Sequence, residues 1–347
     1  MAANFQPACR LLFKTILSIK KGLSLTSSIN PRTYLAQNGN DALTSLLRGV
    51  GYRVQPNLVR DLCHVLKTGL PWLISGPRGG GKSALAEALA EACGLQTFYL
   101  QGMEGLRRED VIGYWDREAQ KLHMEMAVRF GNKTLDEAEA ETVSRRFFRF
   151  GDPLAAYAYT EVNPLPPVLI LDEVDKLTEP LQDMLLQMMG RGFGYVAGLG
   201  NIGNKDRACW PLVVLLSNDI RYELSAPLRS RCLFSLLPMP TIVEQAEILA
   251  LRCPQASPAL VRQVAKVLNA MQAVATIKDK PGPREAIELL KALVADGVES
   301  LNEQVLNFYV AFMVKQENDH VNYLKATRRL VEAANVRHAL LDNWNLL

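Results

Sequence analysis

Glycine, lysine and a hydroxyl side chain, residue types that proteins use to bind phosphate, come together near residue 80. Residues 76–83 read Gly-Pro-Arg-Gly-Gly-Gly-Lys-Ser and fit the spacing G-x-x-x-x-G-K-[ST]. Glycines let the backbone curl closely enough for several N–H groups to converge on phosphate oxygens. Lys82 is expected to reach the β- and γ-phosphates of a nucleotide, and the Ser83 hydroxyl to bind Mg²⁺. The predicted phosphate-binding residues are Gly76, Pro77, Arg78, Gly79, Gly80, Gly81, Lys82, Ser83 and Ala84.

A strand and a helix are expected to hold this loop in place. The apolar residues 72–74 predict a buried strand before the loop, and Leu85, Leu89 and Ala92 recur at helical spacing after it. The N-terminus of that helix adds the positive end of its dipole to the phosphate site. A glycine-rich turn that fits the spacing by accident would lack both flanking elements. The order of strand, loop and helix therefore favours phosphate binding.

Acidic residues follow a second apolar run, residues 168–171, which predicts a strand buried on both faces. Asp172, Glu173 and Asp175 come directly after it, at the end of a parallel strand where ligands bind. We expect Asp172 to hold Mg²⁺ together with Ser83. Glu173 is expected to act as the general base that activates a water molecule, and Asp175 to orient the loop.

Three further apolar runs, at residues 97–101, 212–216 and 233–237, complete a predicted sheet of five strands. The run 212–216 leads to Asn218, whose amide both donates and accepts hydrogen bonds and can place a water against a γ-phosphate. Residues 241–320 instead carry apolar residues at helical spacing. The sequence thus predicts an α/β domain followed by an all-helical one.

Composition limits the function classes. The chain has 347 residues, a net charge of +3 and scattered basic residues, so no global positive field indicates nucleic acid. Its six cysteines form no C-x-x-C pair and its four histidines lie far apart, which argues against a zinc site and favours a reducing, cytoplasmic compartment. Apolar runs are all shorter than a membrane-spanning helix requires, so no transmembrane segment is expected.

The first 40 residues are basic, with no acidic residue. One interpretation is an organellar transit peptide or a helix on a membrane surface. The other is a partly ordered N-terminal extension, which we favour because no cleavage signal stands out.

Four segments resemble the motifs of an AAA+ ATPase: 76–83 Walker A, 168–175 Walker B, 213–218 sensor 1, and 228–232 the arginine-finger region. Finer features at 103–106, 112–115, 171–176 and 217–225 resemble the MoxR family. The resemblance covers residues 45–320 and implies a P-loop NTPase fold, with a parallel five-stranded αβα core and an all-helical lid. It implies the division 1–40 N-terminal extension, 41–238 nucleotide-binding domain, 239–320 lid and 321–347 C-terminal helix.

The resemblance also assigns roles to single residues. Asn218 would be sensor 1, Arg284 sensor 2, and Arg231 the finger that reaches a neighbour's γ-phosphate. Arg229 is an alternative finger, because it lies two residues away. Residues 102–116 and the hairpin 193–202 would project toward a central pore.

The function that the resemblance implies is Mg-ATP hydrolysis by a homo-oligomeric ring, expected to be a hexamer, that remodels or matures a client protein. A partner with a von Willebrand A domain often accompanies such proteins. Two alternatives stay open: a nucleic-acid motor, which salt-dependent binding to single-stranded DNA would support, and a P-loop kinase for a small molecule. A kinase would leave Asn218, Arg231 and the lid without roles.

Overall fold

The computed structural model describes residues 28–218, 224–338 and 341. Most of the N-terminal extension, and with it the segment that could be a transit peptide, therefore lies outside the described residues. Residues 31–40 form the first part of helix α2 (Pro31–Gly49). No described helix combines the length and apolar character that crossing a membrane requires.

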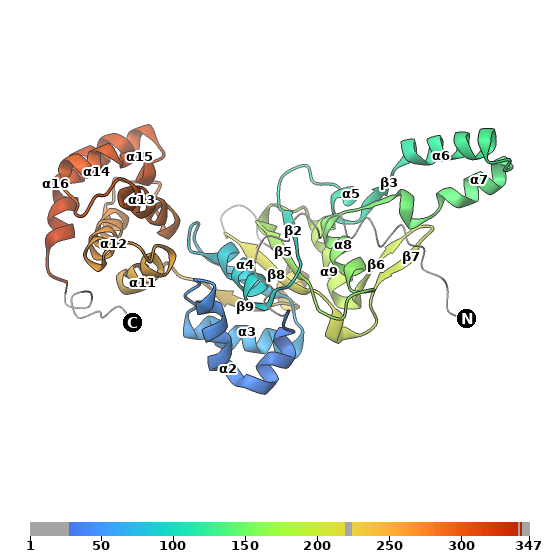
Figure 1. Cartoon of the computed structure of the whole chain (residues 1–347), viewed down its shortest axis with the longest axis horizontal. Helices are drawn as coiled ribbons and strands as arrows, with labels where there is room; N and C mark the ends of the chain where they lie inside the picture. The colour runs from blue at the N-terminus through green and yellow to red at the C-terminus, as the bar shows by residue number, and fades with distance from the viewer. Residues whose placement is uncertain (1–27, 219–223, 339–340, 342–347) are drawn as a thin grey trace.

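Five parallel strands form the central sheet, in the order β2-β5-β8-β1-β9 (Figure 1). Their bounds are β1 Trp72–Ser75, β2 Thr97–Gln101, β5 Val168–Asp172, β8 Leu212–Ser217 and β9 Leu233–Leu236. Each differs by at most one residue at its C-terminal end from the apolar run that predicted it. Because all five strands run in one direction, their carboxyl ends meet at one edge of the sheet. The parallel sheet predicted from the sequence is confirmed.

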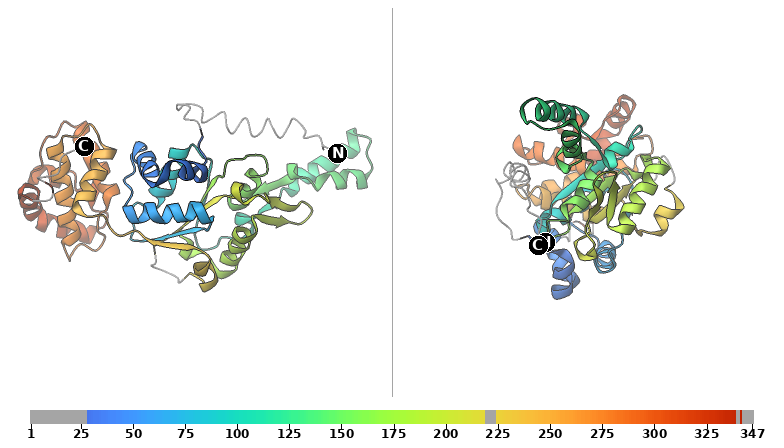
Figure 2. Two further views of the ribbon diagram at one scale, coloured as in Figure 1. Left: turned by 90° about the horizontal axis from the view of Figure 1, so that it is seen from below. Right: turned by 90° about the vertical axis from the view of Figure 1, so that its right-hand side faces the viewer.

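Successive side chains along each strand point to opposite faces of the sheet, so they pack into two separate hydrophobic cores. On β1, Trp72 and Ile74 face the core shared with helices α2, α3 (Pro56–Thr68) and α4 (Lys82–Cys93). Leu73 faces the opposite core, shared with α8 (Asp152–Tyr159), α9 (Glu179–Arg191) and α10 (Ala226–Ser230). Helices thus cover both faces of the sheet, and α2 to α4 lie together on one side (Figure 2). Burial on both faces explains why the strands are continuous apolar runs.

A long excursion between β2 and β5 forms an arm that projects from the domain (Figure 1). The chain passes through α5 (Arg108–Val111) and enters the arm at β3 (Gly113–Trp115), then forms α6 (Arg117–Phe130) and α7 (Leu135–Thr142). It returns through the short helix η1 (Arg145–Phe147) and β4 (Phe148–Phe150), which pairs antiparallel with β3. The arm comprises residues 113–150, because the β3–β4 ribbon closes the excursion at its base, and it overlaps the expected insert 102–116 only at residues 113–116.

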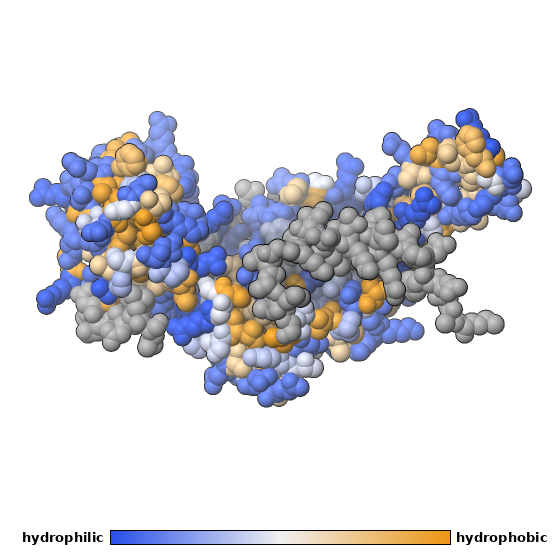
Figure 3. Space-filling view, viewed as in Figure 1, coloured by the Kyte–Doolittle hydropathy of each residue, from blue (hydrophilic) through white to orange (hydrophobic). Residues whose placement is uncertain are grey.

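The arm exposes its larger apolar side chains. Leu122, Met126 and Phe130, four residues apart, form a stripe on α6, and Phe130 is 75% exposed. The residues buried on the two helices include the small Ala127 and Ala138. This apolar surface is visible over α6 and α7 in Figure 3.

After β5 come a short helix, η2 (Val174–Lys176), and then α9. The expected hairpin is present as β6 (Phe193–Val196) and β7 (Gly200–Gly203), which pair antiparallel. A further short helix, η3 (Arg207–Cys209), leads into β8.

The C-terminal region is all helical, as predicted. Its helices are α11 Ile242–Arg252, α12 Pro258–Ala273, α13 Pro283–Ala295, α14 Glu303–Phe308, α15 Val310–Met313 and α16 Glu317–Asn335. They surround a hydrophobic core of their own, which includes Tyr323, Leu330 and Ala334 of α16. The last helix therefore begins at Glu317 and packs within the lid, instead of forming a separate element from residue 321.

Candidate functional site

The glycine-rich loop joins β1 to α4, as its flanking patterns predict, and two of its glycines are required by geometry. A Cβ atom on Gly76 would lie 2.2 Å from the Leu237 carbonyl oxygen, at the end of the neighbouring strand β9. Gly81 has φ 94°, in the left-handed region that side chains rarely adopt, and it precedes the first residue of α4. The backbone can therefore turn tightly into the helix while it packs against β9.

Lys82 lies at the centre of this loop, buried to 6% exposure. Its ammonium group donates to the carbonyl oxygens of Gly76 at 2.7 Å and Pro77 at 2.9 Å, and to Asn218 Oδ1 at 2.8 Å. Burial lowers the pKa of Lys82, and the nearby Asp172 opposes that shift. All three donors of the ammonium group have protein acceptors, which phosphate oxygens could replace with little movement of the side chain.

Ser83 and Asp172 are brought together as predicted. The Ser83 hydroxyl donates to Asp172 Oδ2 at 2.9 Å, and Asp172 Oδ1 accepts from the Glu173 backbone N–H at 2.8 Å. In the described residues no three His, Cys, Asp or Glu side chains form a metal site by themselves. One hydroxyl and one carboxylate are instead the small oxygen set with which proteins bind Mg²⁺ when nucleotide phosphates and waters supply the other ligands. The donor set therefore fits Mg²⁺ bound with a nucleotide.

Glu173 follows Asp172 at the same edge of the sheet, with φ 50° and ψ 45° in the left-handed region. Lys176 Nζ lies 2.5 Å from its Oε2 atom, and Gln101 Nε2 lies 2.6 Å from the same oxygen. These two contacts, led by the Lys176 ammonium, hold the pKa of Glu173 below its usual value of 4.5. Glu173 is thus a carboxylate at neutral pH, engaged by two donors that the motif did not predict.

Asn218 lies between the lysine and the glutamate. Its Oδ1 atom accepts from Lys82, and its Nδ2 atom lies 3.5 Å from Glu173 Oε1. Asp175, 2% exposed, accepts from the Ser217 hydroxyl at 3.2 Å and from the Asn218 backbone N–H at 3.3 Å. Asp175 therefore holds the end of β8, and the orienting role expected for it stays a prediction.

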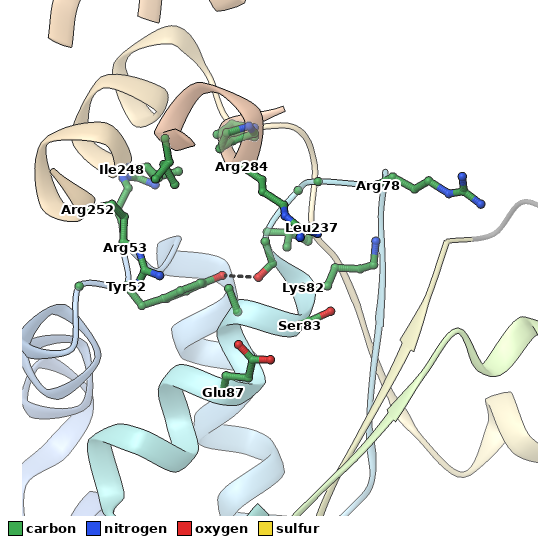
Figure 4. A pocket seen from close by; sticks show the side chains of 18 of the residues that line it. Tyr52, Arg53, Arg78, Lys82, Ser83, Glu87, Leu237, Ile248, Arg252 and Arg284 are labelled. Atoms are coloured by element: carbon green, nitrogen blue, oxygen red, sulfur yellow. Dashed lines mark hydrogen bonds between the residues drawn. The ribbon is translucent and has the colours of Figure 1, made fainter. Parts of the chain in front are cut away.

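These residues open onto a cleft of 810 Å³ between the sheet and the lid (Figure 4). Arg78 to Ala84 line its floor, and Arg284 at the start of α13 lines the lid side. Arg78 extends away from Lys82. Tyr52 donates to the Gly81 carbonyl oxygen at 3.2 Å, and Arg53 forms ion pairs with Glu244 and Glu247 of α11. The Tyr52–Arg53 pair thus connects the glycine-rich loop to the lid, a link that the sequence analysis missed.

The candidate finger residues lie elsewhere. Arg229 and Arg231 are exposed at the end of α10, and neither lines the cleft. Arg231 Nη1 donates to the Pro227 carbonyl oxygen at 3.2 Å, within its own helix turn. The structure therefore brings together every predicted site residue except these two arginines.

Comparison with protein families agrees with this geometry. Residues 71–232 match the family described as AAA domain (dynein-related subfamily). The matched segment covers slightly less than half of the chain, and it is similar to an AAA domain. The match runs from the residue before β1 to the residue before β9, so it includes the glycine-rich loop, both acids, Asn218 and Arg231. With its five-stranded parallel sheet and C-terminal helical region, the chain has the AAA+ P-loop fold.

Solved structures similar to this chain include RuvB from Thermotoga maritima. A RuvB mutant has 16% sequence identity and a TM-score of 0.46, over 84% of this chain and 82% of that one. A RuvB structure described as a Holliday junction branch migration motor has 16% identity and a TM-score of 0.40, over 82% and 83%. No match was found among curated proteins.

Proposed function

We propose that this chain is a Mg-ATP-hydrolysing AAA+ protein of MoxR type, which works as a homo-oligomeric ring and remodels or matures a client protein. The observation that carries the hydrolysis proposal is one hydrogen-bonded group at the edge of the sheet. Lys82 donates a hydrogen bond to Asn218, and Asn218 in turn donates one to Glu173. Ser83 and Asp172, which are hydrogen-bonded to each other, lie beside them. Phosphate binding, metal binding and activation of water all need residues of these types within a few ångströms of each other.

Each residue has a distinct task in this proposal. Lys82 exchanges its carbonyl and Asn218 acceptors for β- and γ-phosphate oxygens. Ser83 and Asp172 hold Mg²⁺, which when bound neutralises phosphate charge. Glu173 accepts the proton of the attacking water once it separates from Lys176, and the Asn218 amide orients that water. Arg284 adds a positive charge from the lid.

The ring is proposed because the AAA domain does not complete its own site. Arg231, with Arg229 as the alternative, is exposed and remote from the cleft of its own chain. A head-to-tail interface that closes by rotation would bring this arginine to the γ-phosphate of a neighbouring copy, and a hexamer is the ring size we propose. The exposed arm offers apolar surface for a client or for a partner with a von Willebrand A domain.

The experiment measures ATP binding and phosphate release by the purified chain and by Lys82→Ala. The variant should lose ATP binding, because the anionic phosphates lose their buried cation. Lys67→Ala, at an exposed lysine on α3, is the matched control and should bind normally. Normal ATP affinity in a folded Lys82→Ala protein would refute the proposal. Phosphate transfer to a small molecule instead of water would support a kinase, and salt-dependent stimulation by single-stranded DNA would support a nucleic-acid motor.

A further inference from the structure

Two side chains of the edge strand β2 reach the two acids of the site. Tyr99 and Gln101, two residues apart, lie on the same face of the strand, and Gln101 is the register partner of Asp172 on β5. The Tyr99 hydroxyl lies 2.9 Å from Asp172 Oδ2 and 2.6 Å from Gln101 Oε1. The Gln101 amide nitrogen in turn donates to Glu173. Neither side chain belongs to a motif that the sequence analysis used.

The position of Tyr99 suggests more than packing. Tyr99 is 40% exposed, so its hydroxyl could form its hydrogen bonds with water at no cost in free energy. The hydroxyl instead points at the carboxylate oxygen that also accepts from Ser83. Asp172 therefore has donors on both oxygens: the Glu173 backbone N–H on Oδ1, and on Oδ2 the Ser83 hydroxyl together with the Tyr99 hydroxyl, whose one proton Gln101 Oε1 also accepts. These contacts leave the carboxylate little freedom to rotate.

We propose that Tyr99 is a positioning residue for the magnesium site, which acts through Asp172. This inference rests on the proposed function, since it concerns the metal that accompanies the nucleotide. A residue that hydrogen-bonds a metal-binding carboxylate fixes the direction in which its oxygens point. Loss of such a partner typically costs about 10- to 100-fold in metal affinity. Tyr99→Phe removes only the hydroxyl and keeps the ring, so it isolates this contact.

The test is the effect of Mg²⁺ on the affinity for a fluorescent ATP analogue, measured as the ratio of dissociation constants in EDTA and in Mg²⁺. Tyr99→Phe should bind the analogue in EDTA as the unmodified chain does, yet lose about tenfold of the Mg²⁺ enhancement. Direct Mn²⁺ titration in the presence of ATP, followed by electron paramagnetic resonance, should show the same loss. Tyr114→Phe, at an exposed tyrosine on β3, is the matched control and should change neither measurement.

One further variant makes the outcome decisive. Asp172→Asn should abolish the Mg²⁺ enhancement. If Asp172→Asn does so while Tyr99→Phe keeps the full enhancement, the Tyr99 inference is wrong and the proposed function stands. If affinity in EDTA falls together with affinity in Mg²⁺, Tyr99 supports the fold and does not position the metal ligand, which also overturns the inference. If the unmodified chain binds no ATP under either condition, the proposed function fails, and the inference fails with it.

Discussion

Lys176 Nζ lies 2.5 Å from Glu173 Oε2, so the proposed general base is held in an ion pair by a residue three positions further along the chain. Both side chains are partly buried, at 21% and 19% exposure, so water still reaches the pair. A carboxylate in this pair is a weaker base than a free one. In the proposed hydrolysis, Glu173 would therefore accept a proton from water more readily once this pair opens.

Lys176→Met should make Glu173 a stronger base. The ion pair lowers the pKa of Glu173 below its ordinary value of 4.5. The hydrolysis rate should therefore fall only at a pH below that value, where Glu173 becomes protonated. Without the Lys176 ammonium, this fall should occur at a higher pH. Turnover at neutral pH should rise by up to about fivefold, which corresponds to the free energy of a single solvent-accessible pair. The measurement is phosphate release against pH. Lys176→Arg, which keeps the charge, is the control, and an acid limb that moves equally in both variants would contradict this explanation.

Glu173→Gln should separate binding from hydrolysis. The amide keeps the size and much of the hydrogen bonding of the carboxylate but cannot accept a proton from water. ATP should bind with normal affinity and be hydrolysed about 10²–10⁴-fold more slowly. Glu179→Gln, at an exposed acid on α9, should be unaffected. Unchanged turnover in Glu173→Gln would place the base elsewhere, and Asp175 is the next acid to test.

Arg231→Ala tests the ring. Because Arg231 lies away from its own cleft, the variant should bind ATP normally and lose about 10³–10⁵-fold in turnover, the value of an arginine finger in other NTPases. Arg229→Ala is the paired variant, and the larger loss identifies the finger. Specific activity of the unmodified chain should rise with protein concentration as rings assemble. Activity that stays constant down to a proven monomer, and survives both substitutions, would refute a finger in trans.

Asp319→Asn should destabilise the lid in a pH-dependent way. Asp319, 1% exposed at the start of α16, accepts the backbone N–H groups of Asp279 and Lys278 at 2.9 and 3.0 Å. These bonds, that from Asp279 first, lower its pKa in the folded state. The carboxylate thus contributes stability above its unfolded pKa of about 3.9, and this contribution disappears as the pH falls through the lower folded value.

Urea unfolding measures the effect. The variant should be less stable than the unmodified chain at neutral pH, because an amide cannot accept both N–H groups as a carboxylate does. The difference should shrink as the pH falls below the unfolded value of about 3.9 and through the lower folded pKa of Asp319, because both forms then carry a neutral side chain. Asp136→Asn, at an exposed acid on α7, is the control. An equal loss at both pH values would show that packing, not charge, makes Asp319 important.

The parts of the site that the sequence predicted depend on local patterns. The glycine spacing placed Lys82 and Ser83, and the apolar runs placed Asp172, Glu173 and Asn218 at strand ends. Burial on both faces requires continuous apolar runs, so the strand bounds were also predictable. The order of the strands at the site then follows from the parallel αβ architecture.

The residues that were missed depend on contacts between distant segments. Gln101 and Tyr99 reach the acids only because β2 pairs with β5 in one particular register, 71 positions apart for Gln101 and Asp172. The link from Arg53 to Glu244 and Glu247 joins the first described helices to the lid. The stripe of Leu122, Met126 and Phe130 has the spacing of a buried helix face, yet these side chains are exposed, so spacing alone does not show whether a face is covered.

The β3–β4 ribbon at the base of the arm has a wider consequence. Gly113 and Phe150, the first and last residues of the ribbon, lie opposite each other, so the chain leaves and re-enters the domain at one point. Whatever the length or surface of the 32 residues between the two strands, the positions of β2 and β5 need not change. The surface of the arm can thus change without altering the strand ends that carry Gln101 and Asp172. New surfaces can be acquired at the arm while the arrangement of the cleft stays as it is.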